Sequence, residues 1–150
     1  MTEGEVLLTT VGLDIVLVGG VALSIVDPES KRIGGNVRTA KRMEVVWRNN
    51  TDRPVVLRFE EWEIDPPRPI TPERPVESVW PFGKFKVDEN PGVVMDANEG
   101  LVRISPGTPF RARLAGMGRM IVKYSVYVPL GSGAPDPAII PLDPMIVVER

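Results

Sequence analysis

Carboxylates are the residues of this chain best able to do chemistry, and four of them share one segment. Glu60, Glu61, Glu63 and Asp65 follow one another closely. Two such acids could act as acid and base in glycoside hydrolysis, and their oxygens are typical Ca²⁺ ligands. Their spacing matches no calcium loop, and arginines on both sides offer solvated ion pairs. We therefore predict no catalytic or metal-binding role for this cluster.

Other candidate sites have simpler readings as well. The segment Asp96–Gly100 begins like a calcium loop but lacks the later ligands, so we predict a turn. Thioethers of Met117, Met120 and Met145 could bind Cu(I), although methionines at strand spacing more often fill a core. The serines have no histidine to activate them, which disfavours nucleophilic hydrolysis.

The absence of two residue types restricts the chemistry further. The chain has no His and no Cys. It therefore lacks the side chain most used for acid-base catalysis near neutral pH, and the imidazole and thiolate ligands of most zinc, copper and iron–sulfur sites. We predict a protein that is not an enzyme and that binds no cofactor and no metal.

Composition favours one all-β domain. The 150 residues can bury enough surface for a single core, and 14 Gly with 16 Pro suit short strands joined by turns. The charge balance, 18 basic against 20 acidic residues, argues against a nucleic-acid partner. The chain has no Cys and no Gln, and a scarcity of such thermolabile residues is found in thermostable proteins. We therefore hypothesise that the protein is thermostable. A melting midpoint in the ordinary mesophilic range would contradict that hypothesis.

The apolar run from Val11 to Val26 is the one stretch that raises the question of export or a membrane. Acidic residues precede it, Asp14 and Ser24 interrupt it, and it is shorter than a spanning helix needs. We expect no signal peptide and no membrane partner. The expected location is the cytoplasm, or a protein shell or virion of which the chain is a part.

The central prediction is a β-hairpin over Met43–Phe59. Apolar residues alternate along Met43–Trp47 and again along Val55–Phe59, and the turn residues Asn49–Pro54 separate the two runs. A second hairpin is expected where Leu13–Val18 and Val21–Val26 flank Gly19-Gly20. These strands are apolar on both faces, so we expect both faces covered, and the segment 1–36 could pack on a neighbouring subunit.

Further strands are predicted from alternation bounded by turn residues. The change of parity between Phe59 and Trp62 indicates either a strand end or a bulge near Glu60, and we favour a bulge or corner. No segment shows a sustained helical period. The remaining predicted strands are Phe82–Val87, Leu101–Ile104, Phe110–Leu114, Met120–Val128 and Met145–Val148, and turn residues are predicted on both sides of Val93–Met95. Their number suits a Greek-key sandwich or a barrel.

A proline-rich stretch, residues 65–81, is predicted to be an extended loop, because its prolines exclude helix interiors and central strands. Long loops of this kind are often functional. Aromatic and arginine side chains are enriched in interface hot spots, so we predict interaction residues in and around this loop. They are Trp62, Arg68, Arg74, Trp80 and Phe82.

The segment Met43–Phe59, MEVVWRNNTDRPVVLRF, resembles the central hairpin of cupredoxin-like domains, in which a strand ending in Trp and Asn leads across a turn to a strand ending in Phe. The segments Ser105–Phe110, Tyr124–Val128 and Asp143–Val148 are similar to that family's closing strands. The resemblance implies a β-sandwich over about 110 residues. In electron-transfer members the first copper-binding His would fall near Val55, and without any His or Cys a blue-copper centre cannot form.

These observations predict a structural or interaction subunit. The expected partners are proteins, in a homo-oligomer or a larger assembly, and one concrete version is a coat or decoration subunit of a capsid or other protein shell. The alternative is a small-ligand-binding or enzyme-associated accessory β-domain with a concave pocket. An enzyme that relies on carboxylates alone is the third reading.

Overall fold

The computed structural model of the chain describes residues 9–27, 37–39, 43–65, 87–96, 99–113 and 119–148. The described elements are strands and one short 3₁₀ helix, so the all-β class is confirmed. None of them is a helix with the length and apolarity to cross a membrane. The elements are β1 (Thr9–Val18), β2 (Ala22–Val26), β3 (Val37–Thr39), β4 (Met43–Asn49), β5 (Val55–Asp65), η1 (Val87–Glu89), β6 (Val93–Asp96), β7 (Leu101–Ile104), β8 (Pro109–Arg113), β9 (Arg119–Tyr127) and β10 (Met145–Val148).

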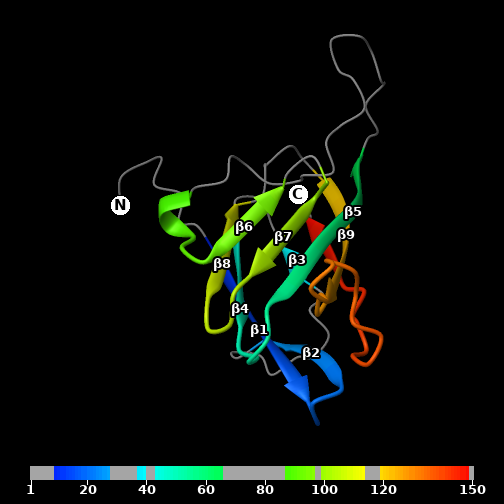
Figure 1. Cartoon of the computed structure of the whole chain (residues 1–150). Helices are drawn as coiled ribbons and strands as arrows, with labels where there is room; N and C mark the ends of the chain where they lie inside the picture. Colours follow the sequence, from blue (N-terminus) through cyan, green and yellow to red (C-terminus); the bar gives the residue numbers. More distant parts are fainter. Residues whose placement is uncertain are drawn as a thin grey trace.

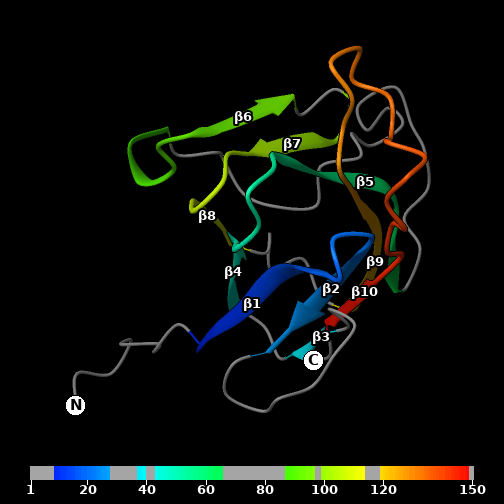
Figure 2. The ribbon, with the colours of Figure 1, turned by 60° about the horizontal axis from the view of Figure 1, so that its bottom comes forward.

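The strands form two sheets (Figures 1 and 2). Sheet A has four strands in the order β2-β1-β4-β8, and sheet B has six in the order β3-β10-β9-β5-β7-β6. Neighbouring strands are antiparallel except for two parallel pairs, β1 with β4 and β10 with β3. Alternate residues of both sheets point into one shared core, which is the arrangement of a β-sandwich.

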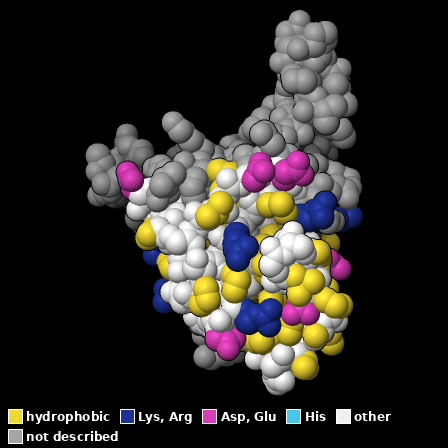
Figure 3. Space-filling view, viewed as in Figure 1, with side chains coloured by type: hydrophobic (Ala, Val, Ile, Leu, Met, Phe, Trp, Pro, Cys, Tyr) yellow, Lys and Arg dark blue, Asp and Glu magenta, His cyan; other side chains and the backbone are white. Residues whose placement is uncertain are grey.

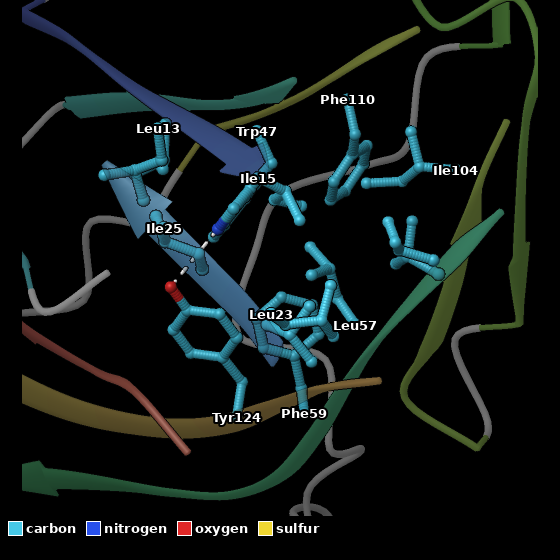
Figure 4. Close-up of a cluster of buried hydrophobic side chains, with 14 of the residues drawn as sticks. Leu13, Ile15, Leu23, Ile25, Trp47, Leu57, Phe59, Ile104, Phe110 and Tyr124 are labelled. Carbon is cyan, nitrogen blue, oxygen red and sulfur yellow. Dashed lines mark hydrogen bonds between the residues drawn. The ribbon is translucent and has the colours of Figure 1, made fainter. Parts of the chain in front are cut away.

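Aromatic rings occupy the centre of this core (Figure 4). Trp47 of β4 stacks on Phe110 of β8, with ring centroids 5.5 Å apart. Its ring meets Phe59 of β5 and Tyr124 of β9 edge-on, at 5.9 and 5.7 Å. Offset and edge-to-face pairs of this kind contribute about 0.5–1.5 kcal/mol beyond their buried area. The four rings therefore link both sheets.

The N-terminal hairpin is confirmed. β1 and β2 pair in antiparallel register, and the turn glycines Gly19 and Gly20 have φ of 60° and 74°. Two successive positive φ values match the twist of a tight hairpin, which explains why two glycines stand there. Only one face of the hairpin is fully covered, because Leu23 and Ile25 are buried while Ser24 is half-buried. Cover of the second face by a neighbouring subunit stays a prediction.

The central hairpin, by contrast, was a wrong prediction. β4 lies in sheet A between β1 and β8, and β5 lies in sheet B between β9 and β7. The connection Asn50–Pro54 is therefore an arch that crosses from one sheet to the other. Alternation predicted correctly that Val45, Trp47, Val55, Leu57 and Phe59 are buried. The same pattern arises whether two strands share a sheet or face each other across a core, so it could not identify the neighbours.

The predicted irregularity near Glu60 is confirmed as a bulge. Phe59 pairs with Tyr124 and Glu61 with Lys123, so one extra residue stands in β5 between them. A bulge shifts which residues face the core, and this accounts for the change of parity in the sequence. The proline-rich loop predicted for residues 65–81 and the strand predicted for Phe82–Val87 lie outside the described part of the chain, except that Asp65 ends β5 and Val87 begins η1.

The two sheets are connected along one side. Ile140 exchanges backbone hydrogen bonds with β2, accepting from the Leu23 N–H (3.1 Å) and donating to the Val21 carbonyl (2.8 Å). Two residues later, Leu142 pairs with Val126 of β9 in sheet B. The chain between them thus closes the sandwich from β2 to β9. On the opposite side, β8 and β6 are the outer strands of their sheets.

Candidate binding surface at the loop-bearing end

One end of the sandwich carries most of the described connections, at the bottom of Figure 1. We call it the loop-bearing end. It comprises the β1–β2 turn (19–21), the arch (50–54), the β7–β8 turn (105–108) and the excursion between β9 and β10 (128–144). The β-ladders bring these segments together, because the strands that lead into them end at the same level of the two sheets.

Asn49 organises this end. It is fully buried, and its side-chain amide donates to the carbonyls of Arg53 (2.7 Å) and Ile104 (2.9 Å). Its Oδ1 accepts from the backbone N–H (2.9 Å) and the hydroxyl (2.7 Å) of Thr51. Both donors and both acceptor positions of the amide are occupied. Asn49 therefore fixes the arch to the end of β7.

The backbone of Asn49 extends the same network to the β7–β8 turn. Its N–H donates to the Thr108 carbonyl (3.0 Å), and its carbonyl accepts from the Gly107 N–H (2.7 Å). The next residue, Asn50, donates its N–H to the Ile15 carbonyl of β1 (2.9 Å). Two consecutive asparagines thus hold the arch to the β7–β8 turn and to β1.

The excursion between β9 and β10 is anchored at Asp136. Its N–H donates to the Val128 carbonyl (2.8 Å), and its Oδ1 accepts from the Ala138 N–H (2.9 Å). Its Oδ2 lies 3.2 Å from Nη2 of Arg53, which joins the excursion to the arch. The hydrogen bond from Ala138, together with the Arg53 guanidinium, lowers the pKa of the Asp136 carboxyl below its usual value. Asp136 is therefore held as a carboxylate.

Exposed apolar side chains border these loops. Val18 and Val21 flank the turn glycines and are 57% and 55% exposed, and Ile140 is 62% exposed. Val21 and Ile140 are adjacent, because their backbones are hydrogen-bonded. Figure 3 shows hydrophobic side chains grouped towards this end of the molecule. Single exposed apolar residues are ordinary, whereas a group of them on neighbouring segments is typical of a contact surface.

A surface concavity of about 440 Å³ lies at the same end. It is lined by the side of the N-terminal hairpin and by the arch: Leu17, Gly20, Asn50, Thr51, Asp52 and Arg53. Its volume is within the range of small-molecule sites, but such sites are usually lined mainly by apolar and aromatic groups. Leu17 is the single large apolar residue of this lining.

The position that the cupredoxin resemblance assigns to a copper-binding His is apolar. Val55 is fully buried in the core cluster, to which Val128 and Ile139 at the start and middle of the excursion also belong. No group of three or more acidic residues in the described part of the chain could hold a metal ion. The residues at this end therefore do not fit a copper centre.

The other predicted site residues are only partly covered. Trp62 lies in β5, where its backbone pairs with Val122, and its side chain is not described. Arg68, Arg74, Trp80 and Phe82 lie outside the described residues. Within the predicted turn after β6, the Glu99 N–H donates to Asp96 Oδ1 (3.3 Å). Glu60 is the extra residue of the bulge in β5, and Glu61, Glu63 and Asp65 follow it; the side chains of all four are likewise not described.

Sequence reasoning missed Val18, Val21 and Ile140 as surface residues. The first two stand beside Gly19-Gly20, and a hairpin tip that projects beyond the sheet was the available signal. Ile140 could not be found this way, because its position depends on the excursion folding back to β2.

No protein-family model matches the chain, and no curated protein is similar to it in sequence. The arrangement of its own residues is therefore the basis of a functional assignment.

Proposed function

We propose that the chain is a non-catalytic interaction subunit, built on a metal-free cupredoxin-like sandwich, that binds a protein partner through its loop-bearing end. The observation that carries this proposal is the group Val18, Val21 and Ile140. These side chains are more than half exposed, although they stand on backbone held by hydrogen bonds. A fixed apolar surface loses little conformational entropy when it is covered, which favours binding.

The cupredoxin-like part of the proposal is supported by where the resembling residues lie. Trp47, Phe59 and Tyr124 form the aromatic centre of the core, and Asn49 lies at the loop-bearing end next to the arch. The buried Val55 at the former ligand position supports a domain that keeps such a sandwich without its metal. In this reading a metal site has been replaced by core packing.

A coat or decoration subunit of a protein shell is one version of this function. Such a subunit needs a rigid scaffold and a defined contact surface, and no chemistry. Backbone hydrogen bonds from Val21 to Val18 and between Ile140 and the β1–β2 hairpin hold the contact residues, and the network through Asn49 holds the neighbouring arch.

The test is native mass spectrometry of the protein isolated from its own source, followed by binding of the identified partner to variants. Val21→Lys combined with Ile140→Lys places two charges in the proposed contact and should weaken binding by at least about 100-fold, since a buried unpaired charge costs several kcal/mol. Val94→Lys, at an even more exposed site on β6, is the control. Partner binding that is unchanged in the double variant would refute the assignment of this surface.

The alternative is an accessory domain that binds a small ligand in the concavity beside Asp52 and Arg53. A protein that is monomeric in the same measurement and retains a small molecule would favour this function. Replacement of Asn50 by Trp, in the lining of the concavity, should then release the molecule, whereas Gly131→Trp in the excursion should not.

A further inference from the structure

Two of the outer strands of the sandwich have covered edges. In β8, the outward-facing N–H and carbonyl of Arg111 are bonded to the side chain of Asn90, at 2.7 and 3.4 Å. In β2, the outward-facing N–H of Leu23 is bonded to Ile140. Covering of this kind prevents a sheet from adding further strands.

Among the described residues, none covers the edge of β6 in this way. The Ser105 N–H donates to the Gly92 carbonyl, so these two residues form a hydrogen-bonded pair of the ladder between β6 and β7. Such pairs alternate along an antiparallel ladder, so the backbone groups of Val94 and Asp96 are bonded to β7. The backbone N–H and carbonyl groups of Val93 and Met95 point away from β7. The N–H and carbonyl of Met95 and the carbonyl of Val93 have no hydrogen-bond partner among the described residues. Figure 2 shows β6 as the outermost strand of its sheet.

The same strand carries Val94, which is 70% exposed on the outer face and is the most exposed large hydrophobic side chain of the described residues. A strand edge with free backbone groups beside an exposed β-branched side chain is suited to pairing with another strand.

We propose that β6 pairs in antiparallel fashion with β6 of a second copy of this chain, around a two-fold axis at Val94, so that the two six-stranded sheets become continuous. This inference goes beyond the proposed function and does not depend on it, since β6 is on the side of the sandwich and the proposed partner surface is at its end.

Hydrogen-bond geometry allows this register, and side-chain pairing selects it. Met95 of each copy lies opposite Val93 of the other, and the Met95 N–H donates to the Val93 carbonyl. Val94 then faces Val94 in a non-hydrogen-bonded pair, where side chains are closest. Shifting the strands by two residues would instead place Val94 opposite Asp96 twice, which opposes an apolar group to a carboxylate.

Charge complementarity also favours a second copy as the occupant. In this register Asp96 lies opposite Gly92 of the other chain, about 14 Å from the other Asp96. Arg103, the cross-strand neighbour of Val94 on β7, is exposed and forms no ion pair with a described residue. Strand spacings place its Cα about 12 Å from Asp96 of the other copy, within reach of a long side chain that extends over Gly92. Two opposite-charge pairs would thus flank the axis.

Cysteine cross-linking tests the register directly, because the chain has no Cys of its own. A non-hydrogen-bonded pair has Cα atoms about 4.5 Å apart, which permits a disulfide. Val94→Cys should form an intersubunit disulfide at least about tenfold faster than Asp96→Cys or Ile140→Cys, since pairing raises the local thiol concentration towards the millimolar range. Equal rates for the three variants would overturn the proposal.

Sedimentation equilibrium and amide exchange provide the second measurement on the unmodified chain. A four-residue contact is small, so dimerisation is expected at about 0.1–1 mM. The Met95 N–H should exchange more slowly as protein concentration rises, while the Val94 N–H, bonded to β7, should not change. Val94→Lys should abolish both effects, and Ile140→Lys should leave them intact. A wild-type chain that stays monomeric at 1 mM would refute the pairing, whatever binds the loop-bearing end.

Discussion

The indole N–H of Trp47 donates a hydrogen bond to the hydroxyl of Tyr124, at 3.2 Å, across the buried interior of the sandwich (Figure 4). Trp47 belongs to β4 of sheet A and Tyr124 to β9 of sheet B. The bond therefore joins the two layers, and it pairs two polar groups at a place that water does not reach. Buried Trp and Tyr usually find such a partner.

Replacing Tyr124 by Phe should lower the free energy of unfolding by about 1–3 kcal/mol, because it removes the acceptor of a buried donor while keeping the ring. Urea unfolding of both proteins measures the difference. Trp47→Phe and the double variant complete a cycle that separates the hydrogen bond from packing, with a coupling of about 1 kcal/mol expected. A loss below about 0.5 kcal/mol for Tyr124→Phe, the range of surface changes, would contradict the role of this bond.

Alkaline pH should destabilise the protein through the same residue. Burial raises the pKa of the Tyr124 hydroxyl well above its ordinary value of 10.0. The unfolded chain loses this proton above pH 10 while the folded chain keeps it, so the contribution of Tyr124 to stability is constant below that pH and falls as pH rises further. Unfolding free energies measured from pH 8 to 11 should fall with rising pH in the wild type, and should fall less in Tyr124→Phe. Parallel curves of unfolding free energy against pH for the two proteins would rule out Tyr124 as the source of the fall.

The two strands that flank residues 50–54 illustrate what the sequence could and could not predict. Burial of Val45, Trp47, Val55, Leu57 and Phe59 follows from alternation alone, which depends only on the period of an extended chain. Which strands are neighbours depends on the path of the arch, and that path is set by Asn49 accepting from Thr51 and donating to Ile104 of β7. A contact with a residue 55 positions away leaves no local signal.

The surface features were less predictable than the core for a related reason. Gly19-Gly20 correctly predicted a hairpin tip, but the partner segment at Ile140 becomes adjacent only when the excursion crosses from β9 to β2. The position of β6 at the edge of its sheet is likewise a property of sheet order rather than of residues 93–96.

Asn49→Ala should be among the most damaging single changes in the chain. It removes four side-chain hydrogen bonds of a fully buried amide, leaving carbonyls and an N–H without their partner, and we expect a loss of about 2–4 kcal/mol. Asn49→Asp is the informative comparison, since a carboxylate can still accept from Thr51 but cannot donate to Ile104. Chemical unfolding should rank the wild type above both variants. Asn50→Ala, at the exposed neighbour, should change stability little, and equal losses at the two positions would contradict the assigned network.

The attachment of the excursion to the arch should weaken in acid. Because the pKa of Asp136 is lowered in the folded protein, its carboxylate contributes stability at neutral pH, and this contribution is lost as pH falls below about 4 and through the lowered pKa. Asp136→Asn keeps an acceptor for the Ala138 N–H and removes the charge that faces Arg53, so it should mimic the effect of acid at pH 7. We expect amide exchange at Ala138 and Ile139 to be faster in the variant than in the wild type at pH 7, and the two rates to converge at pH 3.

Asp143→Asn is the control, because it changes the other carboxylate of the excursion, which has no ion pair with a described residue. It should behave like the wild type throughout. A pH response that is the same in the wild type and in Asp136→Asn would show that the excursion is held by its backbone and by Ile139 in the core, and that the Arg53 ion pair adds nothing to its attachment.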